Sequence, residues 1–89
     1  MFRVEWPDMA FEQMGELIRT HPALAPAFAV GLQRLARDLS QWPDEVGESR
    51  PNDRRIAFFG PLVVYYRIVP AERVVRVIAV YLNPHRPGD

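Results

Sequence analysis

The chain has 89 residues, a formal net charge of zero and no cysteine. This length supports a single domain with a modest core, which we expect to span residues 1–89. The lack of cysteine excludes a disulfide framework and a thiolate metal site, and it fits a reducing cytosol. No apolar run approaches the roughly 18 residues of a membrane span, and the first residues do not read as a signal peptide. Because the two histidines lie far apart and there is no cysteine, we expect no metal site. We also expect a cytoplasmic protein with no small-molecule cofactor and no membrane association.

The charges are divided unevenly along the chain. Residues 1–49 hold four arginines and eight acidic residues, whereas residues 50–89 hold seven arginines and three acidic residues. Such asymmetry indicates an anionic or acidic partner for the C-terminal half. The alternative, that the two halves neutralise each other across the fold, is equally consistent with the sequence.

The N-terminal part predicts a strand followed by a helix. Residues 2–6 alternate apolar and charged side chains, which is typical of a strand with Phe2, Val4 and Trp6 turned inward. A helix is predicted over residues 7–19, because proline and an early acidic residue favour a first helical turn. Its apolar stripe consists of Ala10, Met14, Leu17 and Ile18, with Phe11 beside them.

A second helix is predicted to begin between Pro22 and Pro26 and to reach about residue 41. Its buried face has the helical spacing of four, three and four residues and consists of Phe28, Leu32, Leu35 and Leu39. The short join makes the two helices an antiparallel hairpin. Residues 44–53 are polar and are predicted to form an irregular loop, either a solvated connector or a functional segment.

Three consecutive strands are predicted over residues 54–59, 62–69 and 73–82. β-Branched and aromatic residues fill these segments, and short proline-containing turns separate them at the spacing that hairpins use. The three strands therefore form an antiparallel meander. The tail, residues 83–89, contains two prolines and is expected to be extended and flexible.

Alternation along the second and third predicted strands assigns their faces. One face of each strand is wholly apolar, and together these faces contain Leu62, Val64, Tyr66, Ile68, Val75, Val77, Ala79 and Tyr81. The other faces each hold a central arginine, Arg67 or Arg76. We expect the apolar faces to meet the helices, and Arg67 and Arg76 to share the opposite, open face, where they look toward a partner.

The predicted fold is a two-layer α+β sandwich in the order β-α-α-β-β-β, with a helical hairpin on one face of an antiparallel sheet. The chain resembles the RelE/ParE toxin superfamily in three features: Phe2-Arg-Val-Glu-Trp6-Pro7 before a helix, the helical hairpin, and the meander segments between Arg55 and Val80. The resemblance covers almost the whole chain and rests on the order of the elements and on the kinds of residues that fill the strands.

This resemblance implies a bacterial type II toxin, neutralised by a cognate antitoxin that covers the concave sheet face. Two activities occur in the superfamily: RelE-like members cleave mRNA in the ribosomal A site, and ParE-like members poison DNA gyrase. The position of the first RelE nuclease arginine falls on Val63 here. Where a basic pair is expected at the end of the last strand, the chain has Tyr81-Leu82-Asn83. The usual nuclease set is therefore absent.

Other residues can be considered for such chemistry. The candidates for catalysis are Arg67 and Arg76, which can bind phosphate oxygens, and His85, which suits proton transfer near neutral pH. Glu48 is a candidate base, and Tyr65 can stack on a nucleobase. The candidates for binding RNA or a protein partner are Arg50, Arg54, Arg55, Tyr65, Arg67, Arg76, His85 and Arg86. The alternatives are that Arg67 and Arg76 pair with acidic residues, that Tyr65 packs, and that His85 is merely solvated.

Three functional hypotheses follow. The first is a toxin-like component that acts by protein binding, with an antitoxin as partner and DNA gyrase as a target. The second is a divergent ribosome-dependent mRNA endoribonuclease. The third is an inactive family member that only binds a protein partner.

Overall fold

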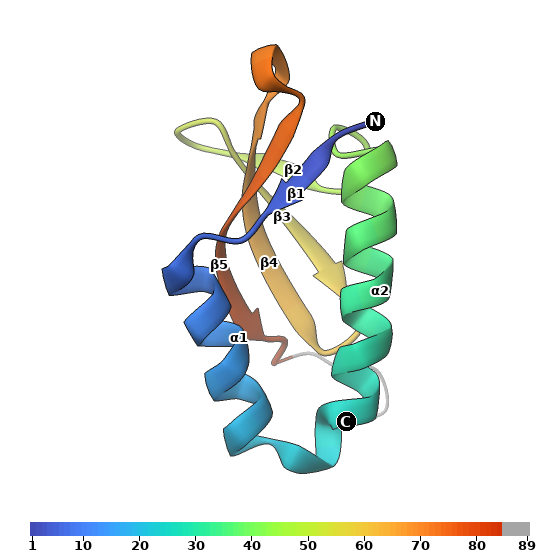
Figure 1. The fold of residues 1–89 in the computed structure, drawn as a ribbon, viewed down its shortest axis with the longest axis vertical. Coiled ribbons are helices and arrows are strands. Elements are labelled where there is room, and N and C mark those ends of the chain that lie inside the picture. The colour runs from blue at the N-terminus through green and yellow to red at the C-terminus, as the bar shows by residue number, and fades with distance from the viewer. Residues whose placement is uncertain (85–89) are drawn as a thin grey trace.

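The computed structural model describes residues 1–84. They form one five-stranded sheet with two helices on a single face, as Figure 1 shows. The elements are β1 (Arg3–Glu5), α1 (Asp8–Thr20), α2 (Ala25–Gln41), β2 (Glu48–Arg50), β3 (Arg54–Phe59), β4 (Leu62–Val69) and β5 (Val74–Leu82), with short 3-10 turns at Pro22–Leu24 and Pro70–Glu72. The predicted two-layer α+β architecture is confirmed. None of the helices in the described region is long and apolar enough to cross a membrane.

The strand order across the sheet is β1-β5-β4-β3-β2. Strands β3, β4 and β5 form the predicted antiparallel meander. Strand β1 joins β5 in parallel, so the sheet is mixed. Parallel strands cannot be joined by a tight turn. After β1 the chain passes through α1 and α2 to β2, which lies at the opposite edge of the sheet, and it reaches β5 only at the end of the meander.

Residues 44–53 differ from the predicted irregular loop, because they contain β2, which pairs antiparallel with β3. Hydrogen bonds from one side chain hold this segment in place. The guanidinium group of Arg55 donates to the carbonyl oxygens of Asp44 and Gly47 and to Oγ of Ser49. A polar segment without apolar alternation gives no strand signal, so its sequence alone did not reveal β2.

The same arginine contacts Tyr66 of β4, whose buried side chain lies on the helix side of the sheet. The Tyr66 hydroxyl donates to the carbonyl oxygen of Pro43 at 2.6 Å and accepts from Nε of Arg55 at 3.4 Å. Burial raises the pKa of Tyr66, and the hydrogen bond from Arg55 partly opposes that rise. Tyr66 and Arg55 thus connect the sheet to the chain that leaves α2.

A bulge in β5 changes which of its residues face the helices. Tyr65 pairs with Ala79 but Tyr66 pairs with Val77, so Ile78 is the extra residue. One extra residue moves every later side chain to the other face. The prediction that Ala79 and Tyr81 face the helices is therefore wrong. Beyond the bulge, the residues that join the core are Val80 and Leu82.

The helices pack on the sheet as predicted, but part of the α1 stripe is not covered. Ala10 and Met14 are buried, whereas Phe11 is 68% exposed and Ile18 is 41% exposed. The reason is that α1 packs mainly on β5 while α2 packs on β1 and β3, so the two helices lie apart (Figure 1). Gly31 allows the close approach of α2 to the sheet, because a Cβ atom there would lie 2.6 Å from the Phe59 carbonyl oxygen.

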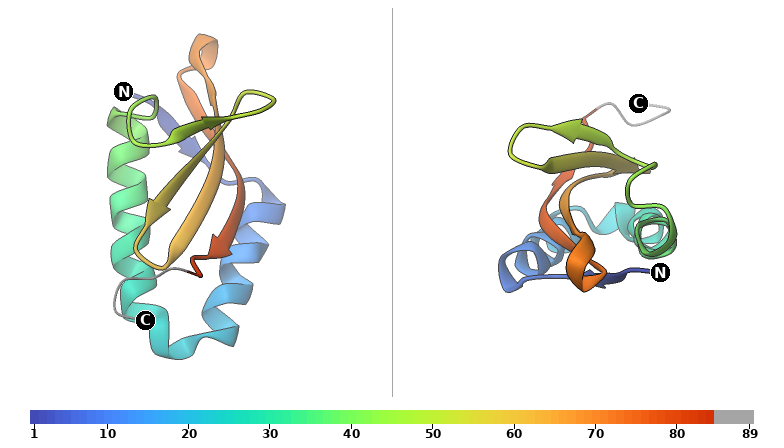
Figure 2. Two further views of the ribbon diagram at one scale, coloured as in Figure 1. Left: turned by 180° about the vertical axis from the view of Figure 1, so that it is seen from behind. Right: turned by 90° about the horizontal axis from the view of Figure 1, so that it is seen from above.

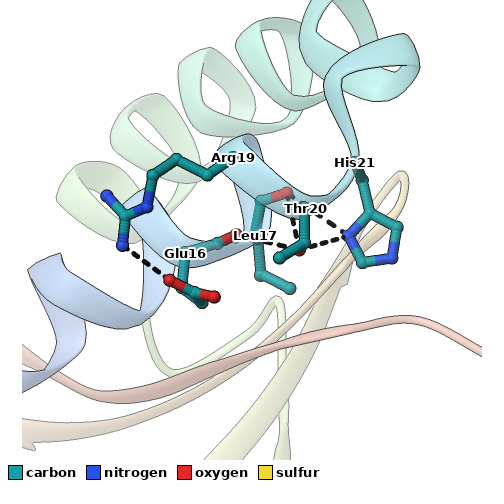
Figure 3. Close-up of polar contacts among 5 residues, drawn as sticks. All are labelled: Glu16, Leu17, Arg19, Thr20 and His21. Carbon is teal, nitrogen blue, oxygen red and sulfur yellow. Dashed lines mark hydrogen bonds and ion pairs between the residues drawn. The ribbon is translucent and has the colours of Figure 1, made fainter.

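Polar contacts close the C-terminal end of α1, as Figure 3 shows. The Thr20 hydroxyl donates to the carbonyl oxygen of Glu16 at 2.9 Å and lies 2.9 Å from Nδ1 of His21. That ring nitrogen is also 3.3 Å from the carbonyl oxygen of Leu17, and Arg19 pairs with Glu16 at 2.7 Å. His21 therefore belongs to the end of a helix, where such groups satisfy free carbonyls.

The ordered chain continues past the last strand. Asn83 is buried, its backbone N–H donates to the Pro61 carbonyl oxygen at 2.7 Å, and its side-chain amide donates to that of Gly60 at 3.4 Å. Asn83 therefore does not fit the predicted flexible tail. The rest of that prediction concerns residues 85–89, which lie outside the described residues.

Candidate functional site

The sheet face turned away from the helices is free of covering elements in residues 1–84 (Figure 2). The pairing register aligns four arginines across it, one from each of β2, β3, β4 and β5. Arg50 lies opposite Arg54, and Arg67 lies opposite Arg76. Because Arg55 pairs with Tyr66, the next pair of that antiparallel ladder is Arg54 with Arg67. We call Arg50, Arg54, Arg67 and Arg76 the arginine row, which is roughly 14 Å long at the usual strand spacing.

Like charges directly opposite each other destabilise a sheet. Among residues 1–84, acidic side chains form ion pairs only with the arginines at the two ends of the row. At one end, Arg76 pairs with Glu5 of β1 at 3.1 Å. Hydrogen bonds from Arg3 and then Arg76 hold the pKa of Glu5 below its ordinary value. At the other end, Arg50 pairs with Glu48 at 3.1 Å.

The middle of the row has no such partner. Among residues 1–84, Arg54 makes no hydrogen bond or ion pair with its side chain, and Arg67 makes only a hydrogen bond of 3.5 Å to the Asn52 carbonyl oxygen. A groove of about 440 Å³ lies beside both guanidinium groups. Its lining residues are Ser49, Arg50, Asp53, Arg54, Arg55, Arg67, Ile68 and Pro70. Two cations thus face solvent at the centre of the row.

Aromatic side chains occupy the same face further along the strands. Tyr65 and Tyr81 make an edge-to-face contact with ring centroids 5.9 Å apart. Tyr81 is 51% exposed and Phe58 is 56% exposed. We call Phe58, Tyr65 and Tyr81 the aromatic patch. Tyr65 precedes Arg67 by two residues, which places the patch roughly 7 Å along the strand from the arginine row.

The structure brings together several of the residues singled out in the sequence. The prediction that Arg67 and Arg76 share one open face is confirmed, and Tyr65 lies on that face as well. Arg50 and Arg54 join them. The residues that sequence reasoning missed are Phe58 and Tyr81, and only the bulge in β5 reveals the position of Tyr81.

Other predicted residues lie elsewhere. Arg55 points to the helix side of the sheet edge, where its hydrogen bonds are internal. The alternative of an acidic partner holds for Arg76, which pairs with Glu5. His85 and Arg86 lie outside the described residues. Within residues 1–84, no group of three or more potential metal-ligating side chains occurs.

A second surface lies on the helix side of the molecule. Because α1 and α2 lie apart, a groove of about 540 Å³ remains between them. Within the described part of the chain, apolar residues and one glycine line this interhelical groove: Val4, Trp6, Phe11, Met14, Gly15, Ile18, Leu32, Leu35 and Ala36. The exposed parts of Phe11 and Ile18 form its rim on α1. The α1 stripe predicted to be core is therefore partly a surface.

Known sequence families and curated proteins give no match to this chain, whereas solved structures do. A chain of the toxin–antitoxin complex RelBE2 from Mycobacterium tuberculosis matches with a TM-score of 0.73 and 22% identity, covering 92% of this chain and 98% of that one. A chain of the archaeal RelE–RelB complex from Pyrococcus horikoshii matches with a TM-score of 0.61 and 13% identity, covering 94% and 97%. The conserved hypothetical protein HP0892 from Helicobacter pylori matches with a TM-score of 0.57 and 18% identity, covering 93% and 96%.

These similarities extend over nearly the full length of every chain compared. They show that this chain shares its fold with the matched chains of the RelBE2 and RelE–RelB complexes and with HP0892. The fold resemblance seen in the sequence is thereby confirmed, and a shared fold does not by itself assign an activity.

Proposed function

We propose that this chain is the toxin-like component of a type II toxin–antitoxin system and that a cognate antitoxin binds and neutralises it. The observation that carries the proposal is the interhelical groove. It exposes Phe11 and Ile18 beside other apolar residues in a domain of only 89 residues. Contiguous exposed apolar surface of this kind marks a protein interaction site. The presence of the same fold in two toxin–antitoxin complexes supports an antitoxin as the partner.

The lining of the groove suggests what part of the antitoxin lies there. A groove between two helices, lined by aliphatic and aromatic side chains, suits the apolar stripe of an amphipathic helix. Such a helix would pack its anchors against Phe11, Ile18 and Leu32. A disordered segment that folds on binding would present this stripe only in the complex.

The test is binding of the small acidic protein that we expect to be encoded beside this chain, measured by calorimetry with purified proteins. Phe11→Asp places a carboxylate on the groove rim and should weaken binding at least tenfold, because an unpaired charge would be buried. Met9→Asp is the matched control, since Met9 is 71% exposed on the same helix but does not line the groove. Equal affinity of the two variants would contradict the proposal.

Cleavage of mRNA on the ribosome is the second candidate function, and the arginine row beside Tyr65 supports it, because cations and stacking rings suit RNA. Induced expression with and without Arg67→Ala/Arg76→Ala tests for toxicity through this face. Growth arrest with mRNA cut at the ribosome would support the nuclease. Arrest with intact mRNA and accumulating DNA breaks would support action on DNA gyrase. Unimpaired growth would support an inactive, partner-binding member.

A further inference from the structure

The layer formed by α1 and α2 has an apolar surface that can match a copy of itself. The interhelical groove is lined by apolar side chains, and Phe11 and Ile18 on its α1 rim are largely exposed. These two residues are seven positions apart, so they lie on one side of α1 about two turns from each other. This is an anchor spacing with which amphipathic helices enter apolar grooves. Helix α1 therefore borders a groove and also carries side chains that such a groove accepts.

Small residues leave room for another helix beside these anchors. Gly15 lies between Phe11 and Ile18, and a Cβ atom placed there would meet the end of the Arg19 side chain at 3.3 Å. No neighbouring element of residues 1–84 therefore fills the space beside this glycine. Ala36 lines the α2 side of the groove and is exposed. Because the distance between packed helices depends on the side chains at the contact, Gly15 and Ala36 permit a close approach.

The charges beside the groove have opposite signs on the two helices. Helix α1 holds three acidic residues and one arginine, a net charge of −2, whereas α2 holds two arginines and one acidic residue, a net charge of +1. Asp8 and Glu12 share a stripe with Gly15 at helical spacing, and Glu12 makes no hydrogen bond or ion pair within residues 1–84. The Arg37 side chain on α2 is 64% exposed. Contact of α1 with α2 of another copy would bring opposite charges together.

A two-fold axis along the groove satisfies both requirements. It places α1 of each copy along the interhelical groove of the other, with the Phe11 and Ile18 side chains of the two copies meeting at the centre. Since α1 and α2 run in opposite directions along the groove (Figure 1), the first turns of α1 then lie beside the last turns of α2 in the other copy. Glu12 of each copy faces Arg37 of the other. The contact is isologous, so every favourable pair occurs twice.

The size of the helix layer limits the strength of such a contact. Helix α1 has 13 residues and is about 20 Å long, and two helices side by side are roughly 20 Å wide. The footprint is therefore about 400 Å² per copy, roughly half that of a standard stable interface. Association through a surface of this size is weak and reversible, with a dissociation constant in the micromolar range.

We propose that two copies of this chain associate reversibly through their helix layers, with α1 of each along the interhelical groove of the other and with Glu12 facing Arg37 of the second copy. Self-association covers the apolar groove when no other partner occupies it. A partner helix in the groove and a second copy of this chain exclude each other. That competition rests on the proposed function, whereas self-association itself does not.

Sedimentation velocity of the purified chain across the micromolar range tests the contact. We expect monomers at low concentration and dimers at high concentration. Phe11→Asp should weaken the dimer at least tenfold, because each copy would bury an unpaired carboxylate. Met9→Asp is the matched control and should leave the dimer unchanged, since Met9 is exposed on α1 but does not line the groove. A chain that stays monomeric throughout, or a dimer that survives Phe11→Asp, would overturn the inference.

Reversal of the paired charges tests how the two copies are arranged. Glu12→Arg and Arg37→Glu each make both cross-copy contacts repulsive, and each should weaken the dimer roughly tenfold. An equimolar mixture of the two variants should associate about as tightly as the wild type, because the mixed dimer has two attractive pairs again. Arg34→Glu is the charge control, since Arg34 is exposed on α2 but lies farther around the helix from the groove. A mixture no tighter than the separate variants would overturn the proposed arrangement.

The acidic protein expected to be encoded beside this chain separates self-association from the proposed function. If the chain dimerises through the groove and that protein does not bind, the proposed function is wrong and self-association stands. If that protein binds with sensitivity to Phe11→Asp while the chain alone stays monomeric, self-association is wrong and the proposed function stands. If both occur, the apparent affinity for that protein should fall as the concentration of this chain is raised, and an affinity independent of concentration would contradict the competition.

Discussion

Replacing Tyr66 with phenylalanine removes one buried hydroxyl and nothing else. That hydroxyl donates to the Pro43 carbonyl oxygen at 2.6 Å and accepts from Arg55. The carbonyl loses its side-chain donor, whereas Arg55 keeps its bonds to Asp44 and Gly47. Leaving a buried acceptor unsatisfied costs about 1–2 kcal/mol. For a domain of this size, such a loss lowers the melting temperature by roughly 5–15 °C.

The neighbouring tyrosine provides the control. Tyr65 lies on the opposite face of β4, and its hydroxyl makes no hydrogen bond within residues 1–84. Tyr65→Phe should therefore change the free energy of unfolding by no more than about 0.5 kcal/mol. Urea titration of both variants measures the difference. Equal stability of Tyr66→Phe and Tyr65→Phe would refute the role assigned to the buried hydroxyl.

The alkaline pH dependence tests the same contact independently. Burial raises the pKa of Tyr66 above 10.0, the value expected in the unfolded chain. The folded state therefore binds its proton more tightly, and this stabilisation is complete below pH 10 and is lost as the pH rises toward the folded pKa. No lysine or cysteine titrates in this range, because the chain contains neither. Wild-type stability should fall more steeply above pH 10 than that of Tyr66→Phe, and equal slopes would contradict the assignment.

Two further predictions concern packing and charge. Gly31→Ala should cost roughly 1–3 kcal/mol in thermal or urea unfolding, because its Cβ would lie 2.6 Å from the Phe59 carbonyl oxygen. Gly15→Ala, where the added Cβ meets only the end of a flexible side chain, should be neutral or stabilise by up to about 1 kcal/mol, and the opposite ranking would contradict the packing of α2. Arg76→Gln should raise the pKa of Glu5 toward its ordinary value, since one of the two arginines that hydrogen-bond to this carboxylate is removed. Carbon-detected NMR titration of Glu5 measures the shift, and an unchanged pKa would show that the ion pair does not persist in solution.

The interpretation of the α1 stripe illustrates one limit of sequence reasoning. Periodicity placed Phe11 and Ile18 with Ala10 and Met14 on one apolar face, but only Ala10 and Met14 are buried. Whether such a face is core or surface depends on the distance to α2, which no local pattern contains. The separation of the helices turned part of the predicted core into the interhelical groove.

The open sheet face is a second case in which the local sequence pattern gave only part of the answer. Alternation along β4 correctly grouped Tyr65 with Arg67, because residues two apart in a strand share a face. Alternation along β5 failed beyond Ile78, since a single extra residue exchanges the faces. As a result, Tyr81 was expected under the helices, and it lies half-exposed in the aromatic patch.

By itself, the sequence determined the order of elements apart from β2, the meander, and the sidedness of β4, all of which depend on side-chain periods within a few neighbouring residues. Only the tertiary structure decided that the polar segment before β3 pairs as β2, that β1 runs parallel to β5, and that four arginines align across four strands. These features depend on the pairing register between separate segments, which for β1 and β5 lie at opposite ends of the chain, and on hydrogen bonds such as those of Arg55. Register arises when whole surfaces pack together, so it has no signature within any single segment.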